Sequence, residues 1–258
     1  MQIRDQIIER LRERLQDCEP VYALWLEGAD GLGRVDEYSD IDVWLDVEDG
    51  WEEKALDVCL GVLKEFGPLD FVETFEHPHP KIFQYNAHIT GTPEFLLLDI
   101  CVQSHSRGSE GCTFVRDDVA EFPVILFDKA SIIQIIKEPP VNQAEVQKVF
   151  RQCVDTFDQQ SRLRKYLLRA KFLEATAYYG KYVCEPLITM YRLVHTPRHY
   201  EYYLVHITDH LPAEAVKNLE TLHAFRSLED ITRNLSLANR LFAELKGQLL
   251  EKYPFLGE

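Results

Sequence analysis

The sequence lacks the long apolar runs, cysteine pairs and signal-like start that would assign it to several large classes of protein. No apolar run approaches the ~18 residues that a membrane-spanning helix needs, which argues against a transmembrane protein. The first residues mix acids and bases where a signal peptide needs an apolar core, so we expect a cytoplasmic protein. The six cysteines include no Cys-x-x-Cys pair, which predicts reduced thiols rather than a zinc site or disulfides.

Positive charge is also scarce in this chain. Its 28 Lys and Arg residues stand against 43 Asp and Glu, which gives a formal net charge of −15. Proteins that bind nucleic acid normally carry a basic excess, because lysine and arginine neutralise the phosphates. We therefore expect neither a nucleic acid nor a membrane as partner, and the sequence leaves a homodimer open.

The sequence does contain a clear change of pattern at 138–140. Before it, apolar periodicity predicts helices and strands in alternation, and after it only long helical patterns, with Asn142 and Ser227 as predicted N-caps. The predicted fold class is therefore α+β, with an α+β domain over 1–138 and an all-helical domain over 139–258. The predicted strands are 21–26, 41–47, 69–75, 81–89 and 95–103, with 123–127 as an edge strand or connection, and the predicted helices of the first domain are 3–15 and 51–66.

The stretch with the clearest chemistry is a glycine turn, Gly28-Ala29-Asp30-Gly31, followed by Asp40 and Asp42 at the start of a predicted strand. Residues i and i+2 of a strand project from one face, about 7 Å apart. Two such carboxylates repel each other unless a cation lies between them, and hard oxygen ligands suit Mg²⁺. A glycine turn lets backbone N–H groups approach a phosphate. Asp-x-Asp alone is more often a solvated strand face, but this spacing after the buried strand 21–26 favours a metal site.

These residues carry a resemblance to a known family. Gly28–Gly31 followed by Ser39-Asp40-Ile41-Asp42 resembles the signature of the DNA polymerase β-like nucleotidyltransferases, in which Gly-Ser precedes Asp-x-Asp on the next strand. The domain order, with 168–175 and 249–253, resembles the small-molecule enzymes that modify lincosamide and aminoglycoside antibiotics. The resemblance implies a minimal catalytic domain, a mixed β-sheet with flanking helices, followed by a helical bundle. It also implies Mg²⁺- or Mn²⁺-dependent transfer of a nucleoside monophosphate from an NTP to a hydroxyl of a small molecule, with release of pyrophosphate.

The resemblance further implies three carboxylates that bind metal and take part in catalysis. Two are Asp40 and Asp42, and the third lies on a nearby strand. We assign it to Asp99, because an unpaired charge in its apolar run would be expensive without a cation or a catalytic cluster. Glu94 is the alternative, although its place at a turn suits a solvated residue. The residues implied to contact the triphosphate are Gly28, Ala29 and Ser39.

The helical segment 162–181 reverses the charge of the chain, with six basic residues and one acid. Arg162, Lys165 and Arg169 share one helical face by their spacing. We predict that Lys165 and Arg169 contact phosphates, and the alternative is an ordinary solvated helix.

The sequence departs from the family pattern at Ala29, where the family has a serine whose hydroxyl holds a phosphate oxygen. This departure keeps open a catalytically inactive nucleotide-binding or interaction protein on the same fold. A further alternative, which does not depend on Ala29, is an antitoxin-type enzyme that nucleotidylates a protein. Separately, His105 lies between Ser104 and Ser106, but no acid could be placed beside it, so we predict no hydrolytic triad there.

Overall fold

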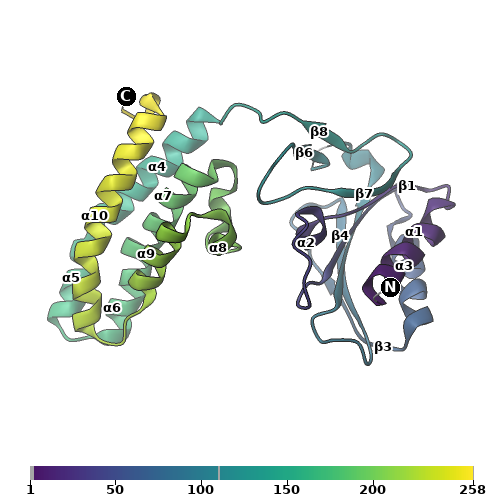
Figure 1. Ribbon diagram of the computed structural model, residues 1–258, viewed down its shortest axis with the longest axis horizontal. Helices are drawn as coiled ribbons and strands as arrows, with labels where there is room; N and C mark the ends of the chain where they lie inside the picture. Colours follow the sequence, from purple (N-terminus) through teal and green to yellow (C-terminus); the bar gives the residue numbers. More distant parts are fainter. Residues whose placement is uncertain (1–2, 110, 258) are drawn as a thin grey trace. The chain divides into compact units, whose positions relative to one another are not determined.

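The structure is a computed structural model that describes residues 3–109 and 111–257 (Figure 1). It divides into two compact units, Met1–Pro139 and Pro140–Glu258. The first contains a mixed sheet with flanking helices, and the described residues of the second form helices and no strand, so the predicted α+β class is confirmed. All six cysteines are free thiols in this structure. Within the described residues, no helix combines the length and the apolarity that crossing a membrane requires.

The first unit is organised around a six-stranded sheet with the strand order β3-β4-β5-β2-β1-β7. The central strands β2 and β5 are parallel, and every other neighbouring pair is antiparallel. The turn-like stretch 90–94 predicts a hairpin between the strands before and after it, and the antiparallel pairing of β4 with β5 confirms it. The strands are β1 (Val21–Leu26), β2 (Ile41–Val47), β3 (Leu69–Phe75), β4 (Ile82–Ile89), β5 (Leu97–Ser104) and β7 (Val124–Asp128).

Two helices, α1 (Ile3–Gln16) and α3 (Glu52–Phe66), cover one face of this sheet (Figure 1). Their buried stripes pack on every second residue of the central strands, because side chains alternate between the two faces of a strand. The resulting apolar core includes the fully buried residues Ile7, Leu15, Leu63, Val43 and Ile100.

The opposite face of the sheet carries a smaller apolar cluster and several polar side chains. Trp25, Phe114 and Ile132 are buried there, beside the short parallel pair β6 (Thr113–Val115) and β8 (Gln134–Ile136). The sequence analysis missed β6 and β8, because three residues are too few to show a period of two. The single helical turn α2 (Gly28–Gly31) also lies on this side (Figure 1).

The second unit is a bundle of helices around its own apolar core, in which the rings of Phe157 and Phe242 stack 3.8 Å apart. The apolar stripe that runs from Val146 to Ala177 predicts a helical pattern over these residues. The structure interrupts it, because Ala170 adopts a left-handed φ of 54° between two helices. The predicted N-caps Asn142 and Ser227 are both confirmed. The helices are α4 (Gln143–Phe157), α5 (Ser161–Leu168), α6 (Phe172–Tyr179), α7 (Glu185–His195), α8 (Ile207–His210), α9 (Ala213–His223) and α10 (Leu228–Lys252), with short turns η2 (Asp158–Gln160), η3 (Gly180–Cys184), η4 (Pro197–Tyr202) and η5 (Pro254–Gly257).

Candidate functional site

Two of the predicted carboxylates lie side by side on the polar face of the sheet. Asp42 of β2 is the register partner of Asp99 on the parallel strand β5. Both point away from α1 and α3, because their neighbours Ile41 and Ile100 belong to the core on the helix-covered face. The structure therefore brings Asp99 to Asp42, whereas Glu94 is exposed in the turn before β5.

The glycine turn α2 approaches these carboxylates closely. Gly28 has a φ of 55°, and a Cβ added to it would lie only 1.8 Å from Oδ2 of Asp42. Any other residue here would displace the carboxylate, so glycine is required by both its backbone conformation and its contact. Gly31 is constrained by contact alone, because a Cβ there would lie 1.6 Å from the carbonyl oxygen of Phe122. Ala29 lies between them, and its carbonyl oxygen accepts a hydrogen bond from Arg34 N at 2.9 Å.

The acids of this cluster repel one another. Burial, together with the nearby charges of Asp40, Asp99 and Asp30, raises the pKa of Asp42 to about 7. Arg4 opposes this rise. Burial also raises the pKa of Asp99, and hydrogen bonds from Gln84 counter the rise. A cation bound among these half-buried carboxylates would reduce their mutual repulsion, so the cluster is a candidate cation site.

Asp99 is held by amides of β4. Nε2 of Gln84 donates to both carboxylate oxygens, at 3.0 and 2.8 Å. The amide of Asn86, oriented so that its nitrogen faces acceptors, donates to Oδ1 at 3.1 Å. These contacts fix the orientation of the carboxylate and leave it ionisable.

Glu27 is a further carboxylate of the cluster that the sequence analysis missed. It directly follows β1, its N–H donates to the carbonyl oxygen of Asp42 at 3.1 Å, and its Oε1 accepts from the indole of Trp25 at 2.7 Å. Burial raises its pKa to about 7, and the charges of Glu121 and Asp42 add to the rise. The available signal was a single acid directly between a buried strand and the glycine turn.

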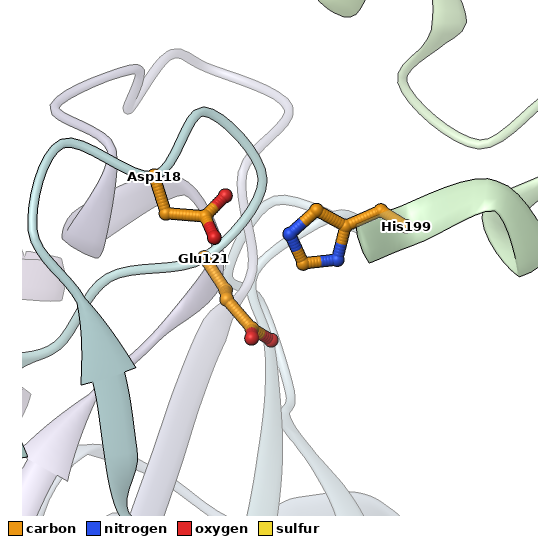
Figure 2. Close-up of side chains that lie close together, drawn as sticks. All are labelled: Asp118, Glu121 and His199. Carbon is orange, nitrogen blue, oxygen red and sulfur yellow. The ribbon is translucent and has the colours of Figure 1, made fainter. Parts of the chain in front are cut away.

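Acidity continues onto the loop between β6 and β7. Figure 2 shows Asp118 and Glu121 on this loop, with carboxylate oxygens that lie within 4.8 Å of each other. His199, which the same figure draws, belongs to the second unit. Through Glu121 this loop adds negative charge beside Glu27.

The other predicted contact residues are placed differently. Ser39 is half-buried, and its hydroxyl is engaged with Asp36, accepting from the backbone N–H and donating to Oδ1, both at 2.9 Å. Lys165 lies on α5 in the second unit, with its ammonium group 4.9 Å from the ring centre of Tyr166. Arg169 follows α5 at the exposed turn.

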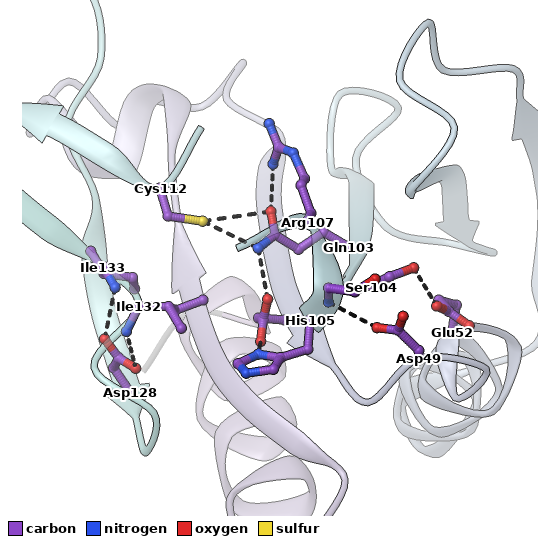
Figure 3. Close-up of polar contacts among 12 residues, drawn as sticks. Asp49, Glu52, Gln103, Ser104, His105, Arg107, Cys112, Asp128, Ile132 and Ile133 are labelled. Atoms are coloured by element: carbon purple, nitrogen blue, oxygen red, sulfur yellow. Dashed lines mark hydrogen bonds and ion pairs between the residues drawn. The ribbon is translucent and has the colours of Figure 1, made fainter. Parts of the chain in front are cut away.

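The structure corrects the expectation that no acid orients His105. Nδ1 of His105 lies 2.6 Å from Oδ1 of the fully buried Asp46, and Gln103 donates to the other oxygen at 2.7 Å (Figure 3). The acid was missed because Asp46 is 59 residues away in sequence. Ser104 does not complete a triad with this pair, because its hydroxyl donates to Glu52.

No family model and no curated protein matches this chain. It is similar to an aminoglycoside 6-adenyltransferase from Bacillus subtilis, with 14% identity over 97% of this chain and 91% of that chain and a TM-score of 0.41. It is similar to a nucleotidyltransferase-like protein from Exiguobacterium sibiricum, with 11% identity, coverage of 98% and 77%, and a TM-score of 0.37. A spectinomycin adenyltransferase from Enterococcus faecialis, in a structure with ATP and spectinomycin, shows 8% identity, coverage of 98% and 99%, and a TM-score of 0.33.

Proposed function

We propose that this chain is a nucleotidyltransferase that moves a nucleoside monophosphate from an NTP to a hydroxyl group of a small molecule. The observation that carries the proposal is the pairing of Asp42 with Asp99 on adjacent parallel strands, with the backbone of Gly28 against Asp42. Metal-assisted phosphoryl transfer requires carboxylates for the cation and backbone donors for the phosphates in one place.

The carboxylate cluster fits a divalent cation such as Mg²⁺ or Mn²⁺. Asp40 and Asp42 would hold it, with Asp99 completing the set. The acids raise the pKa of Asp42 because each disfavours ionisation of the next, and a cation among them removes that repulsion. When bound, Mg²⁺ supplies positive charge that stabilises the phosphoryl oxygens during in-line displacement.

The remaining groups position the reactants and move the proton. Asp99, held by Gln84, accepts the proton of the acceptor hydroxyl. The hydroxyl oxygen then bonds to the α-phosphorus, and the bond to the β-phosphate's bridging oxygen breaks, so pyrophosphate leaves with that electron pair. Gly28 and Ala29 offer backbone donors to the triphosphate. Ser39 would contact it only after its hydroxyl leaves Asp36.

The acceptor proposed is a cationic small molecule of the aminoglycoside or lincosamide kind. The second unit contains a cavity of about 500 Å³, a size typical of small-molecule sites. Its lining contains three acids, Glu145, Glu185 and Glu201, and two lysines. Glu145 is already paired with Lys148, so the proposed contacts for the amino groups of a ligand are Glu185 and Glu201. Lys165 and Arg169, with no carboxylate bonded to either in the described residues, are the proposed phosphate contacts of this unit.

The test is transfer of label from α-³²P-labelled NTPs to a panel of hydroxylated, amino-bearing small molecules in the presence of Mg²⁺. We expect a labelled product and pyrophosphate with wild type and neither with Asp42→Asn. Mg²⁺-dependent NTP binding without transfer to any acceptor would contradict the proposed nucleotidyltransferase activity.

A second candidate function is nucleotide binding without catalysis, and Ala29 is the observation that favours it. Restoring the hydroxyl by Ala29→Ser distinguishes the two, because tighter NTP binding with no turnover on any acceptor would support the inactive protein. Label that enters a protein of a cell lysate, rather than a small molecule, would instead support nucleotidylation of a protein.

A further inference from the structure

Arg4 joins three segments of the first unit that are distant in sequence. It lies in the first turn of α1, and its side chain is only 8% exposed. Its Nη1 donates to Oδ1 of Asp30 at 2.7 Å, and its Nη2 donates to the other oxygen of the same carboxylate. Nη2 also donates to the carbonyl oxygen of Asp40 at 2.7 Å. One guanidinium group thereby ties α1 to the glycine turn and to the residue that precedes β2.

The hydrogen bond from Arg4 holds the backbone of Asp40, which the strand pairing of the sheet does not hold. Asp40 lies one residue before β2, so the register of β2 with β5 begins only at Ile41. The position of the Asp40 backbone is therefore set by Arg4 rather than by the strand ladder. Asp42, in contrast, is fixed by its partners on both sides.

The ion pair with Arg4 neutralises the charge of Asp30, which lies near the other carboxylates of the cluster. Asp30 lies close enough to raise the pKa of Asp42, and its side chain is only 12% exposed. A buried carboxylate without a partner would be costly there. The planar fork of an arginine satisfies both of its oxygens, which the single ammonium group of a lysine cannot do in the same geometry.

We propose that Arg4 is the positioning residue of the carboxylate cluster, and that it preforms the divalent-cation site by holding Asp30 and the backbone of Asp40. The proposal rests on the proposed function for the cation site itself. In the proposed reaction Arg4 contacts none of the reacting atoms. It acts through Asp40, which it places, and through Asp30, which it keeps away from the cation.

The test measures Mn²⁺ binding to the full chain by the loss of the free-ion electron paramagnetic resonance signal. Arg4→Lys keeps the charge and removes the fork, and we expect affinity to fall about 10- to 100-fold, as for other residues that orient metal ligands. The matched control is Arg10→Lys on the same helix. Its guanidinium pairs with Glu65 and Glu13 at the surface, so affinity should stay within about twofold of wild type.

A second variant keeps the test informative if Arg4→Lys folds poorly. Asp30→Asn removes the charge that anchors Arg4 with almost no change in shape, so it should also weaken Mn²⁺ binding. Combined with Arg4→Lys it should weaken binding little further, because both changes break one contact. Equal Mn²⁺ affinity in wild type, Arg4→Lys and Asp30→Asn would overturn the role of Arg4 and leave the cation site standing. Absence of Mn²⁺ binding by wild type, equal to that of Asp42→Asn, would instead overturn the cation site.

Discussion

The face of the central sheet that α1 and α3 cover is built from aliphatic side chains, whereas the other face of the same strands carries carboxylates and amides. Val43 and Ile100 are fully buried in the apolar core, and their neighbours Asp42 and Asp99 point to the polar side. A shift of one residue in either strand would exchange the two faces. The apolar face therefore sets the register that places the acids together.

This difference shows where the stability and the reactivity of the unit come from. Burial of the aliphatic face stabilises the sheet, with about 25 cal/mol for each Å² removed from water. The carboxylate face does the reverse, because burial and mutual repulsion raise the pKa of Asp42. The apolar face therefore offsets the free-energy cost of the buried carboxylates. Substitutions on the apolar face should reduce stability, whereas substitutions of the carboxylates should reduce activity.

The largest expected effect comes from two adjacent residues of β2, because Asp42 should matter for activity and Val43 for stability. Asp42→Asn should reduce nucleotidyl transfer by several orders of magnitude while it leaves the fold intact, because it removes a proposed cation ligand and relieves repulsion. Val43→Ala should reduce the free energy of unfolding by about 1–3 kcal/mol and leave turnover per folded molecule nearly unchanged. Transfer assays and urea denaturation measure both quantities. Near-normal transfer by Asp42→Asn would sink the assigned site.

The next effect concerns two glycines with similar backbones. Gly28 and Gly33 both have positive φ, 55° and 64°, but a Cβ meets Asp42 only at position 28 and nothing within 4 Å at position 33. Gly28→Ala should therefore abolish Mg²⁺-dependent NTP binding. Gly33→Ala should show only the cost of the backbone conformation, about 1 kcal/mol. Thermal shifts with NTP and Mg²⁺ test this pair, and equal loss in both variants would mean that contact with Asp42 is irrelevant.

The pH dependence of stability tests the polar face of the sheet in the wild-type protein, because the apolar face carries no titrating carboxylate of this cluster. Burial raises the pKa of Asp42 and Glu27 to about 7, from ordinary values of 3.8 and 4.5. The folded protein thus keeps protons that the unfolded chain has released, so its free energy of unfolding should fall as pH rises between about 4 and 7. Mg²⁺ should reduce this fall, because it favours the ionised acids. Urea denaturation at several pH values checks both, and a Mg²⁺-independent profile would argue against a cation at these acids.

Much of the fold could be predicted because its elements are long and periodic. The bounds of β1 and β2 match the predicted ranges, and α3 ends at Phe66 as expected. The spacing of Asp49 and Glu52 predicts a capping pair for α3, but the structure shows no side-chain cap at this helix start. Asp49 accepts instead from the N–H of Ser106 at 2.8 Å, and Glu52 accepts from Ser104. Side chains that find distant partners cannot be assigned from local spacing.

The candidate site could be predicted only where its residues follow a local pattern. Asp40 and Asp42 stand in a motif, and Asp99 stood out as a charge inside an apolar run. Arg4 and Gln84 gave no such signal, because each acts through a partner at least 15 residues away in sequence. Their roles depend on the register of β4 with β5 and on the docking of α1, which are properties of the folded unit.

The smallest expected effect tests Ala29, the position where the turn departs from the Gly-Ser pattern that it otherwise resembles. Ala29 keeps its carbonyl bonded to Arg34 N, and a serine would not disturb that contact. Ala29→Ser should add one neutral hydrogen bond to a phosphate oxygen, worth about 1 kcal/mol or about fivefold in NTP affinity. The control is Ala29→Cys, which has similar size and a weak donor. A gain with serine alone, measured by titration calorimetry with Mg²⁺, would place the triphosphate at the polar face. No gain with serine would mean that the turn does not meet the phosphates, whatever the acids of that face bind.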